Sequence, residues 1–413
     1  MEQMSAYGIK QRKVTKASIL FGITKLLISA LFIYEGWYIE KYGAIPMLLQ
    51  ALAALIVFFM IACKIYMPQK RKRDTAIVIW WTIFGIVAFI VGLFSSYNYV
   101  INDALFTYFA FLLMCFCTGF LTENGNDSWI SKTIIITALL CAFCTMFDGF
   151  NYKNGGYYGI TMSENNNPNT LGMMMAIGVF YLIMPKYKQS VWMWLVRIVL
   201  SYVCVHISLN TGSRSSLICM LTVIGLSIYF NVRYYLTGNY LMKILKRLLI
   251  IIVCLISIIF VLSYVQSIES GTSGINRLIE NFNEASYNSR IRLYSAAWNL
   301  FLERPMFGVG YKCFSFFSNF DYFTHSTYME LLSCTGLVGF FLFMIPIFKG
   351  LKNAITYRRQ DNGRTLTLLL MFVVGGFFGI LYYNLIFMML LYLMILNINF
   401  FAMEDTNDKN DCA

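Results

Sequence analysis

Three basic side chains, far apart in the sequence, are the strongest candidates for chemistry in this chain. Arg214 and Arg290 carry guanidinium groups, which stay charged and present a planar fork of donors that fits a diphosphate or a carboxylate. His325 is one of only two histidines. It titrates near neutral pH and could accept a proton from an attacking hydroxyl group. All three stand beside apolar segments, so whether they meet depends on how those segments are arranged.

Two further ionisable residues lie close to these in the sequence. Arg292 follows Arg290 by two positions, so on a helix the two side chains point about 200° apart. Only one of them is therefore expected to face the ligand. Glu330 lies inside an apolar segment, where an ionisable residue is functional by default. It is five residues from His325, so the two do not share a helical face.

The loop at residues 148–167 is rich in Asn, Gly and Tyr. Such a loop could present amides and aromatic rings to a sugar, or it could be an ordinary solvated loop. Asn169 follows it directly and could contact a ligand or simply cap the next helix. His206, in an apolar run, is expected to be a satisfied core residue.

A second and longer polar stretch, residues 266–325, contains Arg290, Arg292 and His325. From Ser289 its apolar residues recur at helical spacing, which predicts an amphipathic helix at the membrane interface or packed on the bundle. Pro305 should stop this helix, and glycines 308 and 310 then permit a tight turn.

The composition of the chain requires a membrane protein. Its 413 residues are 59% hydrophobic and 13% charged, which is more apolar surface than a soluble core can bury. Runs long enough to cross about 30 Å of hydrocarbon recur along the whole length. They predict an all-α polytopic bundle of about 12 transmembrane helices, at residues 18–34, 43–63, 76–94, 103–121, 130–147, 168–184, 191–210, 214–231, 244–265, 326–348, 365–381 and 384–402. No linker or repeat divides residues 1–413, so we expect one membrane domain, with residues 266–325 as an extracytoplasmic loop between spans nine and ten.

The distribution of Lys and Arg predicts the orientation. Of 32 such residues, 22 fall in the segments on the side of both termini and 8 on the other. Because cytoplasmic loops retain cations, both termini are expected in the cytoplasm, and Arg214, Arg290 and His325 on the opposite side. Arginines there need a reason, although they could simply bind lipid phosphates at the rim, and His325 could merely cap a helix or mark the interface.

Several other classes of protein are disfavoured. The net charge of +12 is explained by cytoplasmic anchoring against anionic membrane lipids, and no basic domain is left to bind nucleic acid. Most of the 11 cysteines fall inside apolar spans, where Cys behaves as a small hydrophobe, so neither a disulfide framework nor a metal site is expected. The polar start and the lack of a cleavage site argue against a removable signal peptide.

Three motifs, taken in order, resemble the O-antigen ligase/polymerase superfamily. They are residues 210–216 (NTGSRSS), the Ser289-Arg290 start of the loop helix together with residues 305–310 (PMFGVG), and residues 325–328 (HSTY) followed by 336–339 (GLVG). The resemblance covers residues 167–343 and rests on the order and topology of the motifs. This chain departs from the family in having Tyr294 where Trp is frequent, Ser326 where Asn follows the His, and Cys334 in place of an acid.

The resemblance implies a metal-independent membrane enzyme of the glycosyltransferase-C type, without a cofactor. Such enzymes join a polyprenyl-diphosphate-linked glycan to an acceptor at the outer membrane face. The diphosphate would be held by Arg214 and Arg290, while His325 serves the acceptor. Apart from the roles that the resemblance implies, we predict Arg292, Ser213, Asn169, Tyr294 and Glu330 as substrate-binding residues.

These observations favour a polysaccharide polymerase, of capsule, exopolysaccharide or O-antigen type, in the plasma membrane of a bacterium. Its expected partners are an undecaprenyl-diphosphate-linked glycan, membrane lipids, and the flippase and chain-length regulator of the same pathway. An O-antigen ligase would use the same donor with lipid A core as acceptor. The richness in Lys, Asn and Ile indicates an AT-rich genome, and a species without an outer membrane would exclude a ligase. A lipid-linked glycan flippase or transporter would show inverted repeats and interrupted helices, neither of which is clear, and a non-catalytic scaffold would make the clustered cations a coincidence.

Overall fold

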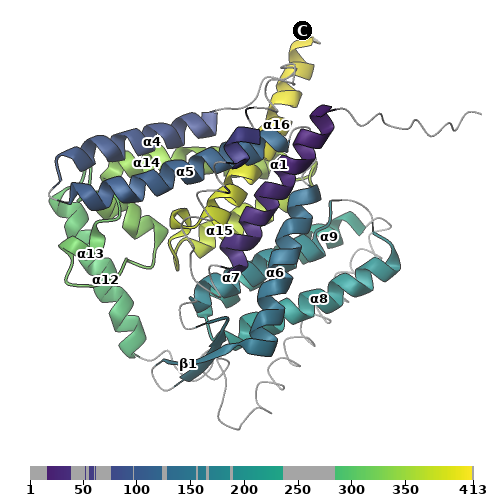
Figure 1. Ribbon diagram of the computed structural model, residues 1–413, viewed down its shortest axis with the longest axis horizontal. Coiled ribbons are helices and arrows are strands. Elements are labelled where there is room, and N and C mark those ends of the chain that lie inside the picture. The colour runs from purple at the N-terminus through teal and green to yellow at the C-terminus, as the bar shows by residue number, and fades with distance from the viewer. Residues whose placement is uncertain are drawn as a thin grey trace, which may run out of the picture.

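The protein is a multi-pass bundle of apolar helices (Figure 1). The computed structural model describes residues 16–38, 52, 55–59, 61, 76–95, 97–122, 128–154, 157–163, 167–186, 189–235 and 284–411. Its main helices and strands, in chain order, are α1 (Lys16–Ile33), η1 (Tyr34–Tyr38), α4 (Ala76–Leu93), α5 (Asn98–Leu121), α6 (Ser128–Asp148), β1 (Phe150–Asn154), β2 (Tyr157–Thr161), α7 (Pro168–Ile183), α8 (Val191–Asn210), α9 (Arg214–Tyr235), α12 (Glu284–Glu303), α14 (Thr327–Thr356), α15 (Arg364–Gly375) and α16 (Leu385–Asp411). The short helices α13 (Phe314–Phe317) and η3 (Leu381–Tyr383) lie between them.

Two helices form the centre of the bundle. In α7 every residue from Leu171 to Leu182 is buried, and the first eleven residues of α16 are buried as well. A helix that is apolar all round must be surrounded by other helices, and α7 packs on α6, α8 and α9. By contrast, α8 leaves large apolar side chains exposed, with Trp192 at 78% and Tyr202 at 65%. Such a face fits contact with lipid rather than with water.

The prediction of membrane spans agrees with the helices that can be compared. Within the part of the chain that the structure describes, six helices are long and apolar enough to cross a membrane. They are accompanied by four shorter apolar helices, which are α7, α15 and the apolar parts of α9 and α16. These ten coincide with ten of the twelve predicted spans. The span predicted at 244–265 lies outside the described residues, and so does most of the one at 43–63. An all-α polytopic membrane fold is therefore confirmed, although the number of spans is not.

The span predicted at residues 365–381 is shorter in the structure. The helix α15 ends at Gly375, and the chain then turns through residues 376–380 into η3. Three glycines at 375, 376 and 379 explain this end, because glycine favours turns over helix interiors. The resulting turn, residues 376–380, becomes an anchor for the candidate site.

The Asn- and Tyr-rich loop contains a β-hairpin that the sequence did not predict. Strands β1 and β2 pair antiparallel, with Phe150 opposite Thr161. Figure 1 shows the hairpin at the end of the bundle opposite the C-terminus, and this end is called the hairpin end below. The tyrosines in this segment favour strand pairing, but a two-stranded hairpin is too short for its periodicity to stand out.

A break in α14 docks the turn that follows α12. At Gly336 the backbone has φ 63° and ψ −167°, so the helix opens and frees backbone groups. The N–H groups of Val309 and Gly310 donate to the carbonyls of Ser333 and Cys334 at 3.0 and 2.9 Å. In the opposite direction, residues 337 and 338 donate to the carbonyls of residues 305 and 306 at 2.8 and 3.1 Å. These four bonds replace lost helical ones and fix the end of α12 against α14.

Candidate functional site

His325 lies in a tightly held loop just before α14. Its φ is 57°, a left-handed conformation that is uncommon for a residue with a side chain and often marks a functional site. The hydroxyl of Thr324 donates to the carbonyl of Ser326 at 2.9 Å and accepts the N–H of Ser326 at 3.3 Å. The imidazole is half-buried and packs edge-on against Phe323, with ring centroids 4.8 Å apart. The loop therefore holds this histidine in one orientation.

The carboxylate of Glu330 braces the same loop from behind. Glu330 is 1% exposed. Its Oε2 accepts the N–H of Thr324 at 3.0 Å, and its Oε1 accepts the hydroxyl of Tyr383 at 3.1 Å. A buried carboxylate with these partners is satisfied by the protein itself. The sequence predicts Glu330 as a substrate-binding residue, whereas the structure places its carboxylate beneath the loop.

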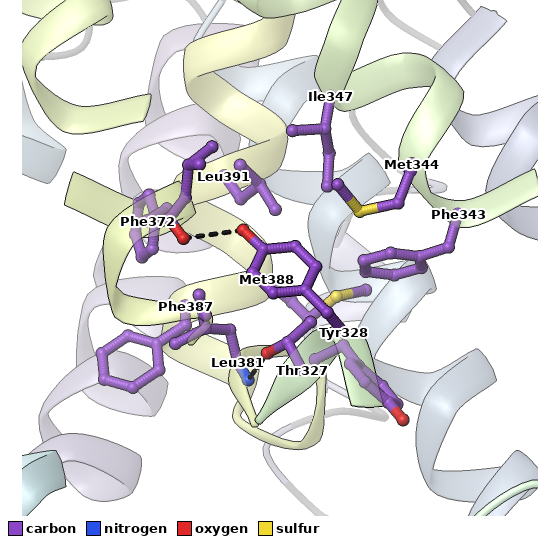
Figure 2. A pocket seen from close by; sticks show the side chains of 13 residues that line it. Thr327, Tyr328, Phe343, Met344, Ile347, Phe372, Leu381, Phe387, Met388 and Leu391 are labelled. Atoms are coloured by element: carbon purple, nitrogen blue, oxygen red, sulfur yellow. Dashed lines mark hydrogen bonds between the residues drawn. The ribbon is translucent and has the colours of Figure 1, made fainter. Parts of the chain in front are cut away.

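The residues after His325 attach the loop to the turn at 376–380. The N–H of Thr327 donates to the carbonyl of Gly376 at 2.8 Å, and its hydroxyl donates to that of Gly379 at 2.7 Å. Figure 2 shows the hydroxyl of Tyr328 reaching across to the carbonyl of Val373, at 2.6 Å. The cavity drawn there, about 20 Å³, is lined by apolar side chains, and its polar groups already have partners. It is therefore packing space within the bundle rather than a polar substrate site.

The loop helix α12 attaches to this same turn. The hydroxyl of Tyr294 donates to the carbonyl of Phe377 at 2.9 Å. One helical turn earlier, Arg290 is half-buried and close enough that its charge acts on both Tyr294 and His325. The side chain of Arg292 is exposed, as expected for the other face of the helix. The structure thus brings Arg290, Tyr294 and His325 together from separate motifs.

The electrostatics of His325 favour its neutral form. Burial lowers the pKa of the imidazole below its ordinary value of 6.5, and the positive charge of Arg290 lowers it further, because both disfavour the imidazolium ion. A neutral imidazole at pH 7 has a free lone pair and can accept a proton.

This shift makes a prediction for the pH dependence of activity. The neutral form persists as the pH falls to 6.5, so kcat/KM should decline only below that value, as His325 becomes protonated. Replacing Arg290 with Gln removes one of the two causes, so the acid limb of the residual activity should move to higher pH. An acid limb that stays in place in this variant would contradict the proximity of the two groups.

A second prediction concerns the anchor of α12. Tyr294→Phe removes the hydroxyl that holds the helix to Phe377 while keeping the aromatic ring. A single hydrogen bond contributes about 1 kcal/mol, so we expect activity to fall several-fold with little change in thermal stability. Tyr99→Phe, at an exposed tyrosine of α5, is the matched control. Equal activity of the two variants would show that this bond does not position Arg290.

Arg214 stands at another polar cluster of the hairpin end, at the first residue of α9. Beside it, the hydroxyls of Ser213 and Ser215 donate to Asn169 Oδ1 at 2.5 and 2.9 Å. A Cβ on Gly172 would lie 2.0 Å from the hydroxyl oxygen of Ser216, so glycine alone lets α7 and α9 approach this closely. These contacts fix where the guanidinium of Arg214, half-buried, leaves the helix.

Two residues of the sequence analysis have local roles in the structure. The cap of α7 is Asn167, whose Oδ1 accepts the N–H of Asn169 at 2.9 Å. Asn169 is therefore not the cap, and its amide oxygen accepts the hydroxyls of Ser213, just before α9, and of Ser215 within α9. His206 lies 3.0 Å from Asn210 Nδ2 and stacks on Tyr202, which fits a satisfied packing role.

The loop helix begins at Glu284 rather than Ser289, since Glu284 and Ala285 also favour helix.

Sequence reasoning missed several residues of the site. Thr324 and Tyr383 contact Glu330, and Phe377 contributes the carbonyl that accepts the hydroxyl of Tyr294. Every residue type has a backbone carbonyl, so a contact made by one cannot be predicted from the identity of the residue. Tyr383 could have been found only as a polar aromatic residue close to a glycine-rich turn.

The structure defines a multi-pass bundle of apolar helices in which Arg290, Tyr294 and His325 come together beside the turn at residues 376–380. Residues 207–344 match the model of a protein family described as O-antigen ligase. The match spans the three motifs from Arg214 to Gly339, and it supports the assignment to the O-antigen ligase/polymerase superfamily and an enzyme of the membrane ligase/polymerase type. No curated protein matches the chain significantly.

Proposed function

We propose that this protein is a polysaccharide polymerase that acts at the outer face of the cytoplasmic membrane. Its donor is a growing glycan on undecaprenyl diphosphate, and its acceptor is a lipid-linked repeat unit. The observation that carries the proposal is the proximity of Arg290 to the half-buried His325, within a region that matches the O-antigen ligase family.

The reaction is an inverting displacement at the anomeric carbon of the reducing-end sugar. The hydroxyl oxygen of the acceptor forms the new glycosidic bond, and the bond from that carbon to the diphosphate oxygen breaks. His325 takes the hydroxyl proton. Arg214 and Arg290 neutralise the charge that develops on the departing diphosphate. Orientation matters as much as charge, so the bonds that brace the His325 loop belong to the same mechanism.

The alternative is an O-antigen ligase, the activity after which the matching family is named. Its donor would be held by the same arginines, with lipid A core as acceptor. The two proposals differ in the acceptor alone, so the acceptor decides between them.

The test is an assay of purified protein in EDTA with lipid-linked repeat units as the only glycan substrate. We expect longer chains on undecaprenyl diphosphate, and none when Arg290 is replaced by Ala. In a parallel assay with added lipid A core, glycan joined only to that core would identify a ligase. Dependence on a metal ion, or full activity of the Arg290 variant, would contradict both.

A further inference from the structure

Lys312 is a cation with an unfavourable backbone conformation in the segment between α12 and α13. Its φ is 63°, in the left-handed region that a residue with a side chain rarely adopts. Of the described residues other than glycine, three have a positive φ, and they are Lys312, His325 and Asn362. Asparagine tolerates this conformation in turns, whereas lysine has no local bond that favours it. Because backbone strain clusters at functional sites, the conformation of Lys312 points to a function, as that of His325 does.

The backbone on both sides of Lys312 is held in place. Its neighbours Tyr311 and Cys313 are 2% and 0% exposed. The N–H of Cys313 donates to the carbonyl of Gly310 at 3.1 Å, and the N–H of Gly310 donates to the carbonyl of Cys334 in α14 at 2.9 Å. The side chain of Lys312 itself is exposed. The turn therefore presents this lysine outward from a fixed position.

The ammonium group of Lys312 lies over the ring of Tyr383. Its Nζ is 5.4 Å from the ring centroid, which is the distance of a cation–π contact. The hydroxyl of the same tyrosine donates to Glu330, whose other oxygen accepts the N–H of Thr324, the residue before His325. One tyrosine and one carboxylate thus connect Lys312 to the loop that carries the histidine.

Lys312 and Arg290 are both attached to residues 376–383. Arg290 lies one helical turn before the tyrosine of α12 that bonds to the carbonyl of Phe377, and Lys312 contacts the ring at the other end of this segment. The His325 loop is bonded to the same segment. The two cations are therefore placed around one loop, although they come from different turns of the chain.

The chemistry of Lys312 fits a phosphate. Among the described residues, no carboxylate pairs with its ammonium group. Lysine is a compact point charge with three rotatable donors and is a usual ligand of phosphate. A diphosphate that links a lipid to a sugar carries one negative charge on each phosphate, and it gains another when the bond to the sugar breaks. A cation beyond the two arginines would stabilise that additional charge.

We propose that Lys312 is a further substrate-binding residue, whose ammonium group binds the diphosphate of the donor lipid together with Arg214 and Arg290. The inference rests on the proposed function, which assigns that diphosphate to the two arginines. A phospholipid headgroup offers the same phosphate chemistry, so the two lipids are compared in the test.

Binding of each lipid to the purified protein in phosphatidylcholine nanodiscs tests this assignment. The probes are undecaprenyl diphosphate and phosphatidylglycerol. Lys312→Gln should weaken binding of undecaprenyl diphosphate about tenfold, as expected for loss of a hydrogen bond to a charged group, and leave binding of phosphatidylglycerol unchanged. Lys312→Arg keeps the charge and should retain most of the binding.

Two more variants control for charge and for folding. Arg304→Gln removes another exposed cation that lies over an aromatic ring, at 5.2 Å from the centroid of Phe317. That ring belongs to α13 rather than to residues 376–383, so this variant should bind both lipids as the wild type does. Lys312→Gly removes the charge and the backbone strain together. Its Tm should equal or exceed that of the wild type, while its binding falls as in Lys312→Gln.

The outcomes separate the two proposals. Wild-type protein that does not bind undecaprenyl diphosphate overturns the proposed function and this inference with it. If the wild type binds this lipid and Lys312→Gln binds it equally well, the inference alone is overturned. The same holds if Lys312→Gln loses phosphatidylglycerol to the same extent, or if Lys312→Arg binds as weakly as Lys312→Gln. A Tm of Lys312→Gly well below that of the wild type would show that the lysine supports the fold instead.

Discussion

His325→Ala and Arg290→Gln are each expected to reduce polymer formation by about 10²- to 10⁴-fold, the range for removal of a general base or of an electrostatic contact to the transition state. His325 is held by the loop that Glu330 and Thr327 brace, and Arg290 is close enough to lower its pKa. Both side chains are only half-buried, so folding should be largely preserved. Chain length on lipid-linked substrate, with kcat and KM determined separately, is the measurement.

The control for lost charge is Arg359→Gln, which removes an exposed arginine that the account places on the opposite side of the membrane. It should retain activity within about twofold, as expected for a surface substitution. Arg292→Gln gives an internal comparison, since its exposed side chain should matter less than that of Arg290. If Arg292→Gln proves the more damaging of the two, the wrong face of α12 has been assigned to the substrate.

Gly336→Ala is expected to destabilise the fold by about 3 kcal/mol or more, from backbone strain and overpacking together. The backbone at Gly336 has φ 63° and ψ −167°, a region that is essentially restricted to glycine. An added Cβ would also lie 2.4 Å from the carbonyl carbon of Met306, which belongs to the turn that docks α12. We expect a large fall in Tm in detergent, and loss of activity even where folded protein remains, because α12 would no longer hold Arg290 in place.

Gly225→Ala in α9 is the matched control. A Cβ at Gly225 meets nothing within 4 Å, and alanine favours a helix interior over glycine by about 0.5–1 kcal/mol, so this variant should be neutral or slightly more stable. Equal Tm values for the two variants would show that the break in α14 does not need glycine.

Much of the fold could be predicted from the sequence because a long apolar run is a strong signal for a membrane helix. Apolar runs such as that of α4 have no polar alternative, and their length matches the bilayer. The predictions failed where local backbone geometry determines how a helix ends or bends. The glycines at 375, 376 and 379 end α15 early, and the π-helical turn at Tyr34–Tyr38 leaves no periodic signal.

The candidate site was predictable as a set of residues but not as an arrangement. Arg290 and His325 stood out because cations are costly near a membrane, and the structure places them together. The role of Tyr294 came from the resemblance, and its bond to Phe377 could not have been inferred from the sequence. Glu330 was correctly singled out, but its bond to a backbone N–H depends on a left-handed residue at 325, which sequence patterns do not encode.

The most direct test of the account is a structure of the protein with bound undecaprenyl diphosphate, determined by electron cryo-microscopy in lipid nanodiscs. We expect the diphosphate to contact the guanidinium groups of Arg214 and Arg290 at the hairpin end, with His325 facing the oxygen that carries the sugar. A diphosphate bound at the other end of the bundle, or one that contacts neither arginine, would contradict it.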